Sequence, residues 1–131
     1  EEFLLIRHTN DTNNPVPKNK ELTNMKLLLL EEGHCLRSQT LSFCKINSVP
    51  KNIMEGTTLT TLVQMVSSGI GVTLIPEIAV PFETRSTKVS VSRFNQQKPK
   101  RTIGLVWRKS NPLTQQFNEI GSLLKNLNKL N

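Results

Sequence analysis

Two cysteines, Cys35 and Cys44, are the side chains of this 131-residue chain with the most evident chemistry. They lie nine residues apart, and the stretch over 36–46, which starts directly after Cys35 and contains Cys44, has no Gly or Pro and spaces its apolar residues as a helix does. On one helix this separation is about 13 to 14 Å of rise and about two and a half turns, so the thiols lie on opposite faces. A disulfide needs Cα atoms within about 7 Å. The pair could bond only if the helix unwound, as in a two-state switch.

The two thiols occupy unlike positions on this predicted helix. Cys35 lies at its start, where unpaired amides and the helix dipole stabilise a thiolate, and His34 and Arg37 add positive charge nearby. Cys44 lies in the last turn beside Phe43, an apolar setting that favours a buried, protonated thiol. The pattern indicates that Cys35 reacts with an oxidant to give a sulfenic acid. Cys44 would then condense with it to a disulfide that a reductant reverses.

Other interpretations stay open on the residues alone. Two cysteines in a small cytoplasmic domain are often plain packing residues, and a lone His34 beside a turn is often a surface residue. A zinc site from His8, His34, Cys35 and Cys44 would lack the short paired-ligand spacing of such sites. A thiol peroxidase or oxidoreductase would need a CxxC or a Pro-x-x-x-Thr/Ser-x-x-Cys arrangement, and the chain has neither. We therefore expect no metal centre and no enzyme.

Composition narrows the class of protein. A hydrophobic content of 36% suits one modest core or two small lobes. No apolar run approaches the roughly 18 residues of a membrane helix, and the start of the chain lacks the features of a signal peptide, so we expect a cytoplasmic protein with no membrane contact. The net charge of +7 comes from scattered Lys and Arg without aromatic interleaving. This favours a solvated basic surface over a DNA-reading face.

The hydropathy pattern predicts an α/β fold. Strands are expected over residues 3–7, 27–30, 72–75, 88–92 and 102–107. Helices are expected over 36–46, from the cap Thr58 to a stop at Gly69, and after Asn111 and Pro112, where apolar residues form one stripe. Strands that alternate with helices imply a largely parallel sheet.

The segment that holds the cysteines also carries a resemblance. Gly33-His34-Cys35-Leu36-Arg37-Ser38-Gln39, followed by Phe43-Cys44, closely resembles the redox-active segment of the OxyR group, the peroxide-sensing LysR-type transcriptional regulators. Further matches follow in order within residues 58–76, 79–81 and 101–108. The Gly-x-Gly-x-x-Leu-x-Pro segment is shared by LysR-type regulators generally. The Gly-His-Cys segment with a second Cys nine residues later is specific.

The resemblance implies a fold and a division of the chain. It implies an α/β regulatory domain of periplasmic-binding-protein type, which has two lobes. Residues 1–101 would be the second lobe with the redox cysteines, and residues 102–131 the return strand and C-terminal helix of the first lobe. The DNA-binding winged helix-turn-helix and the opening half of the first lobe would be absent from these 131 residues.

The resemblance implies a chemistry for the site as well. Hydrogen peroxide would oxidise Cys35, the peroxidatic cysteine, and Cys44 would resolve it in a reversible disulfide that remodels the helix between them. The residues that would support the Cys35 pocket are His34, Arg101, Gly33 and Arg37. No cofactor or metal is implied.

Partners follow from the same resemblance. A glutaredoxin or thioredoxin type of reductant would reset the switch. The full-length regulator would be a homodimer or tetramer, and promoter DNA and RNA polymerase would be reached only through it. The alternative is a small-molecule effector-binding domain of another LysR-type regulator, in which the cysteines are incidental.

Overall fold

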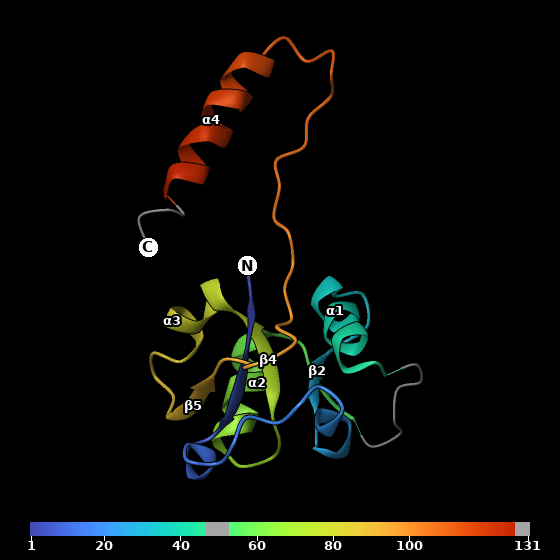
Figure 1. The fold of residues 1–131 in the computed structure, drawn as a ribbon, viewed down its shortest axis with the longest axis vertical. Coiled ribbons are helices and arrows are strands. Elements are labelled where there is room, and N and C mark those ends of the chain that lie inside the picture. The colour runs from blue at the N-terminus through green and yellow to red at the C-terminus, as the bar shows by residue number, and fades with distance from the viewer. Residues whose placement is uncertain (47–52, 128–131) are drawn as a thin grey trace. The chain divides into compact units, whose positions relative to one another are not determined.

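The computed structural model describes residues 1–46 and 53–127, and the chain divides into two compact units, Glu1–Arg101 and Thr102–Asn131 (Figure 1). The strands are β1 (Phe3–His8), β2 (Leu28–Leu30), β3 (Met54–Gly56), β4 (Thr73–Pro76) and β5 (Val89–Ser92). The α-helices are α1 (Cys35–Cys44), α2 (Leu59–Ser67), α3 (Val80–Glu83) and α4 (Thr114–Leu127). Short 3-10 turns lie at Thr9–Asp11, Glu21–Asn24 and Glu77–Ala79. That the two units are the second lobe and a part of the first lobe stays a prediction.

The first unit contains two small sheets. β1 is the middle strand of the order β4-β1-β5 and runs antiparallel to both neighbours. β2 and β3 pair in parallel, and an isolated parallel bridge joins Leu27 to Val72. The expectation of a largely parallel sheet is therefore wrong for the sheet around β1. The sequence order of strands and helices does not fix which strands become neighbours, and β1 takes its partners from β4 and β5, late in the chain.

Apolar runs that the sequence places in strands form the core. Phe3 to Ile6 in β1 are at most 5% exposed, and all of β2 is buried. α2 adds the buried face Leu62, Val63 and Val66 and contacts β1, β2 and β4. Burying an aliphatic side chain stabilises a fold by about 1.5 to 3 kcal/mol, so this shared core determines how the elements pack.

The predicted ends of α2 are confirmed. The Thr58 side chain accepts a hydrogen bond from the backbone N–H of Thr61 at 3.1 Å, as an N-cap does. Gly69 follows the helix with φ +74°, a left-handed conformation that glycine adopts without steric cost. The helix thus begins and ends where the sequence indicates.

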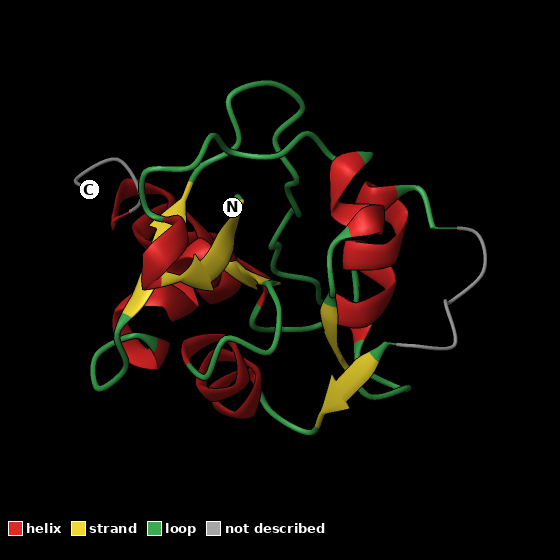
Figure 2. Cartoon of the chain, turned by 90° about the horizontal axis from the view of Figure 1, so that it is seen from below, coloured by secondary structure: helices red, strands yellow, loops and turns green. Residues whose placement is uncertain are grey.

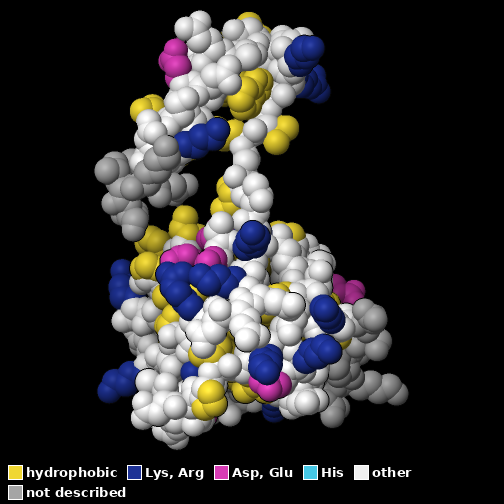
Figure 3. Space-filling model, in the orientation of Figure 1, with side chains coloured by type: hydrophobic (Ala, Val, Ile, Leu, Met, Phe, Trp, Pro, Cys, Tyr) yellow, Lys and Arg dark blue, Asp and Glu magenta, His cyan; other side chains and the backbone are white. Residues whose placement is uncertain are grey.

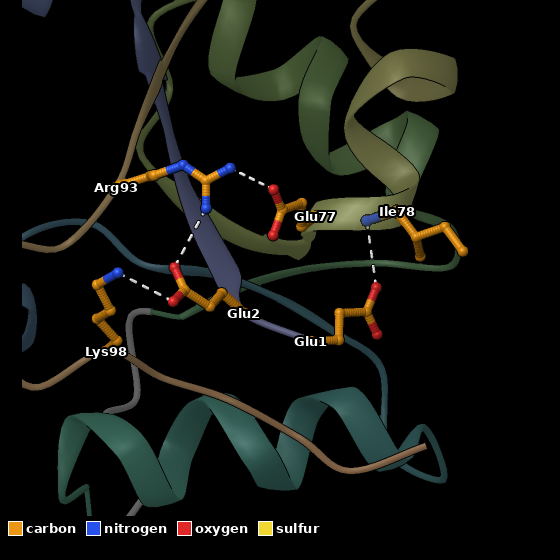
Figure 4. Close-up of polar contacts among 6 residues, drawn as sticks. All are labelled: Glu1, Glu2, Glu77, Ile78, Arg93 and Lys98. Carbon is orange, nitrogen blue, oxygen red and sulfur yellow. Dashed lines mark hydrogen bonds and ion pairs between the residues drawn. The ribbon is translucent and has the colours of Figure 1, made fainter. Parts of the chain in front are cut away.

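A group of ion pairs surrounds the start of β1 (Figure 4). The Glu2 carboxylate binds Lys98 at 3.0 Å and Arg93 at 3.2 Å, and Arg93 also binds Glu77. The backbone supports the same junction, because the N–H of Phe3 donates to the carbonyl of Pro99 at 2.8 Å. The segment that leads out of the first unit is thereby fastened to its first strand.

Lys and Arg side chains are spread over the face of the first unit seen in Figure 3 and form no continuous stripe. Several of them stand next to acidic side chains, as Arg93 and Lys98 do. This distribution agrees with a solvated basic surface. Separately, none of the helices within residues 1–46 and 53–127 has the length and hydropathy to cross a bilayer.

The second unit consists of an irregular segment and α4. The N–H of Leu113 donates to Oδ1 of Asn111 at 2.9 Å in the turn just before α4, which begins at Thr114. Trp107 packs on Phe117 with ring centroids 5.6 Å apart. The strand predicted over 102–107 is absent, and that prediction is wrong for this structure. A strand needs a neighbour for its backbone N–H and C=O groups, and the described residues supply none here.

Candidate functional site

The turn that leads into α1 places Cys35 at a helix start. β2 ends at Leu30, and the N–H of Glu31 then donates to the carbonyl of Gly56 at 3.1 Å, which holds the turn against β3. Gly33 has φ +93° and lets the chain reverse. His34 is the N-cap residue in an extended conformation, and α1 begins at Cys35. Figure 2 shows α1 on the side of the β2 and β3 sheet, away from the three-stranded sheet.

Cys35 and Cys44 are both free thiols, and the helix between them is intact. Cys35 is exposed, whereas Cys44 is 1% exposed. Burial raises the pKa of the Cys44 thiol to about 11, so this thiol is protonated at neutral pH. The predicted opposite settings of the two cysteines are therefore confirmed. Because the two thiols are the first and last residues of an intact ten-residue helix, they cannot bond in this arrangement.

Aromatic and backbone contacts close the end of α1, where Cys44 belongs to the hydrophobic core. Phe43 packs edge to face on Phe94, with ring centroids 5.2 Å apart. Lys45 closes the helix in a left-handed conformation, φ 55°, and the N–H of Ile46 donates to the carbonyl of Leu41 at 3.0 Å. This closure resembles the helix ends that a glycine usually makes, but here a lysine bears the steric cost.

The predicted supporting residues are not all gathered at Cys35. His34 is adjacent and exposed, and its side chain makes no capping hydrogen bond. Arg37 turns toward the sheet instead: its Nη1 donates to the carbonyl of Leu30 at 2.7 Å and lies 2.7 Å from Oε1 of Glu55. A role for either residue in the chemistry of Cys35 stays a prediction.

Arg101 lies at the start of β1 in this structure. Its Nε donates to the Glu1 carboxylate at 2.6 Å, and its guanidinium stands over the Phe3 ring, 5.7 Å from the centroid. Within the described residues it makes no hydrogen bond to Cys35. Its predicted place beside the reactive thiol therefore stays a prediction.

Two further residues near the cysteines were not singled out from the sequence. Gln39 lies one turn after Cys35 on the same helix, and its Oε1 is buried without a hydrogen-bond partner in the described part of the chain. The i, i+4 spacing from Cys35 is the signal that could have found it. The second residue is Glu55, which pairs with Arg37. The two lie on different elements, so no local sequence pattern could have shown that they are partners. As for metals, the described ranges hold no cluster of three or more His, Cys, Asp or Glu side chains.

The fold and the residue pattern can now be compared with known proteins. Residues 7–128 match the family described as the LysR substrate binding domain, which is most of the chain. The chain belongs to this family.

Individual relatives of this LysR substrate-binding domain are transcriptional regulators by name. A probable hydrogen peroxide-inducible genes activator of Mycobacterium avium is 40% identical over 81% of this chain and 35% of the relative. The HTH-type transcriptional regulator EstR of Acinetobacter baylyi is 41% identical over 82% of this chain and 36% of the relative. The chain thus spans little more than a third of each relative.

A solved structure supports the same assignment. A cysteine-to-serine mutant of Corynebacterium glutamicum OxyR with hydrogen peroxide bound is 27% identical, with a TM-score of 0.81. The alignment covers 96% of this chain and 41% of that one. The predicted α/β regulatory-domain fold of a LysR-type, OxyR-like protein is confirmed by this agreement.

Proposed function

We propose that this chain is the hydrogen-peroxide-sensing part of an OxyR-like LysR-type regulator and that it switches through a reversible disulfide between Cys35 and Cys44. One observation carries the proposal: an exposed cysteine begins, and a buried cysteine ends, a single ten-residue helix. Both cysteines are present and no disulfide joins them, as expected for the reduced state of such a switch.

The first step takes place at the exposed thiol. Cys35, as thiolate, attacks one oxygen of hydrogen peroxide and breaks the O–O bond, and the departing hydroxide takes up a proton to become water. The product is a sulfenic acid on Cys35. The helix start offers unpaired backbone N–H groups to the negative charge of the thiolate.

The second step needs a change of structure. Cys44 must leave its buried site, lose its proton and attack the Cys35 sulfur, which releases the hydroxyl group as a second water. One peroxide and two thiols thereby give one disulfide and two waters. While α1 is intact, the high pKa of Cys44 keeps it a weak nucleophile. Unwinding of α1 both exposes this thiol and removes the separation between the sulfurs.

The residues around Cys35 divide by their contacts. His34 and Gly33 form the turn that presents Cys35, and Gln39 offers a buried carbonyl oxygen one turn away. In the proposal these three shape the peroxide pocket. Arg37 and Arg101 would join it only after leaving the carboxylates that they bind here.

The wider role rests on the family and not on these residues. Residues 1–101 would be the second lobe of the regulatory domain, and residues 102–131 would complete the first lobe. The exposed side chains of Ile103, Val106 and Leu123 agree with this, since the missing part of a lobe would cover them. The full-length regulator would act in the bacterial cytoplasm as a homodimer or tetramer, contact promoter DNA and RNA polymerase, and be reset by a glutaredoxin or thioredoxin.

Mass spectrometry after a stoichiometric pulse of peroxide tests the proposal. The unaltered chain should lose the mass of two hydrogen atoms and gain a Cys35–Cys44 cross-link. Cys44→Ser should stop at a sulfenic acid on Cys35, which a dimedone probe traps, and Cys35→Ser should keep a free Cys44 thiol. An unmodified Cys35 in a folded regulator that contains this chain would refute the proposal.

A second candidate function is supported by the Acinetobacter relative, whose name does not mention peroxide although its identity is 41%. The chain would then be a small-molecule effector-binding domain with incidental cysteines. In that case an organic ligand would raise the melting temperature of the regulator, and Cys35→Ser with Cys44→Ser together would leave its response unchanged.

A further inference from the structure

We propose that Glu55 sets the redox potential of the cysteine pair by holding Arg37, and with it the first turn of α1, in the reduced arrangement. This inference rests on the disulfide function proposed above. Glu55 is a positioning residue in this scheme, since it acts through Arg37 and has no contact with either sulfur.

The contacts of Arg37 join three elements. Its side chain is only 8% exposed, although it belongs to the turn of α1 that follows Cys35. The same Nη1 atom reaches the carbonyl of Leu30, at the end of β2, and the carboxylate of Glu55, in the middle of β3, both at 2.7 Å. The guanidinium therefore fastens the start of the helix to the edge of the β2 and β3 sheet.

Burial makes this contact sensitive to movement of the helix. A guanidinium taken out of water needs a counter-charge and hydrogen bonds, and Glu55 and Leu30 provide them. Arg37 lies inside the segment that must unwind before Cys35 and Cys44 can meet. Unwinding pulls the guanidinium away from both partners, so the contact exists in the reduced form and is lost in the disulfide form.

An interaction present only in the reduced form shifts the redox equilibrium toward the dithiol. Stabilising the dithiol raises the reduction potential, so the disulfide becomes easier to reduce. Glu55 would thus set how readily the disulfide forms, although it does not contact either sulfur. Removing its charge should make the potential more negative and the disulfide more persistent.

The experiment compares Glu55→Gln with the unaltered chain in glutathione redox buffers, where one glutathione disulfide oxidises the protein pair and yields two glutathiones. We expect the equilibrium constant for disulfide formation to rise about tenfold, which corresponds to a potential about 30 mV more negative. Glu77→Gln is the matched control, because it removes one carboxylate from the Arg93 ion pairs on another element. Its potential should equal that of the unaltered chain.

A second measurement separates redox coupling from ordinary loss of stability. The melting temperature of Glu55→Gln should fall in the reduced form and stay unchanged in the disulfide form. Equal losses in both forms, with an unchanged potential, would overturn the role of Glu55 and leave the disulfide function standing. Failure of the unaltered chain to form the disulfide at any buffer ratio would instead refute the function on which this inference rests.

Discussion

Cys35 and Cys44 are the first and the last residue of one unbroken helix, and one thiol is exposed to solvent while the other is buried. Cys35 is exposed, and Cys44 is 1% exposed with its pKa raised to about 11. The arrangement separates a thiol that meets the solvent from one that becomes available only after α1 opens. The following predictions test the parts of this arrangement.

Alkylation should distinguish the two thiols. With iodoacetamide at pH 8 in the reduced protein, Cys35 should be modified at least about tenfold faster than Cys44, because only an accessible thiolate reacts. Peptide mass spectrometry over a time course measures both rates. In denaturant the difference should disappear, and comparable rates in the folded protein would contradict the intact-helix arrangement.

The stability of the reduced protein should fall at alkaline pH. The Cys44 pKa is raised from 9.0 to about 11 by burial, so between these values the folded state keeps a proton that the unfolded state has lost. The stability that comes from burying the protonated Cys44 thiol is fully present below pH 9 and is lost as the pH rises toward 11. Urea unfolding across this window should show the decline.

Cys44→Ala is the control for this decline, because it removes the titrating thiol and leaves the rest of α1 in place. Its unfolding free energy should change less between pH 9 and 11 than that of the unaltered protein. If the unfolding free energy fell equally with pH in both proteins, a group other than Cys44 would be responsible for the decline.

A side chain at Gly33 should strain the backbone of the turn before Cys35. Its φ of +93° is unfavourable for an L-residue, and Gly33→Ala should therefore lower the free energy of unfolding by about 1 kcal/mol or more. Open space surrounds a Cβ at this position, so the cost comes from the backbone alone. Gly104→Ala is the control, since it also meets open space and has no left-handed φ, and chemical denaturation of both variants gives the comparison.

The ion pairs at the start of β1 should appear in the titration of Glu2. Hydrogen bonding from Lys98, with smaller effects of its charge and of Arg93, lowers the pKa of Glu2 below 4.5. Carbon-detected NMR should show this lowered value, and Lys98→Met should raise it again. Because the Glu2 side chain is partly open to solvent, high salt should weaken the effect in the unaltered protein. The stability from these pairs is present above the ordinary pKa of Glu2 and is lost as the pH falls through the lowered one.

Local patterns in the sequence were sufficient for most of the elements. β1 and β2 are continuous apolar runs, and α2 has its cap at Thr58 and its stop at Gly69, so each is specified by residues within one short window. The helix that separates the cysteines follows from the same kind of information. The resemblance of the Gly-His-Cys segment added the family, which the comparison of residues 7–128 then confirmed.

Relations between distant residues required the tertiary structure. The antiparallel pairing of β1 with β4 and β5 and the absence of a strand over 102–107 depend on which neighbours are available. The sequence suggests Arg37 only as a support for the Cys35 pocket, and that role stays a prediction, whereas the structure gives Arg37 a partner on β3, Glu55. Its sequence neighbourhood carries no information about that carboxylate.

Residue spacing and helix propensity are enough to place two thiols at opposite ends of one helix, because both act within a few turns. The burial of Cys44 that its apolar neighbours predict is confirmed, but the contact by which Arg37 fastens the helix to β3 appears only in the tertiary structure. Burial and ion pairing depend on which surfaces meet in the folded chain, and the packing of β2, β3 and α1 sets them.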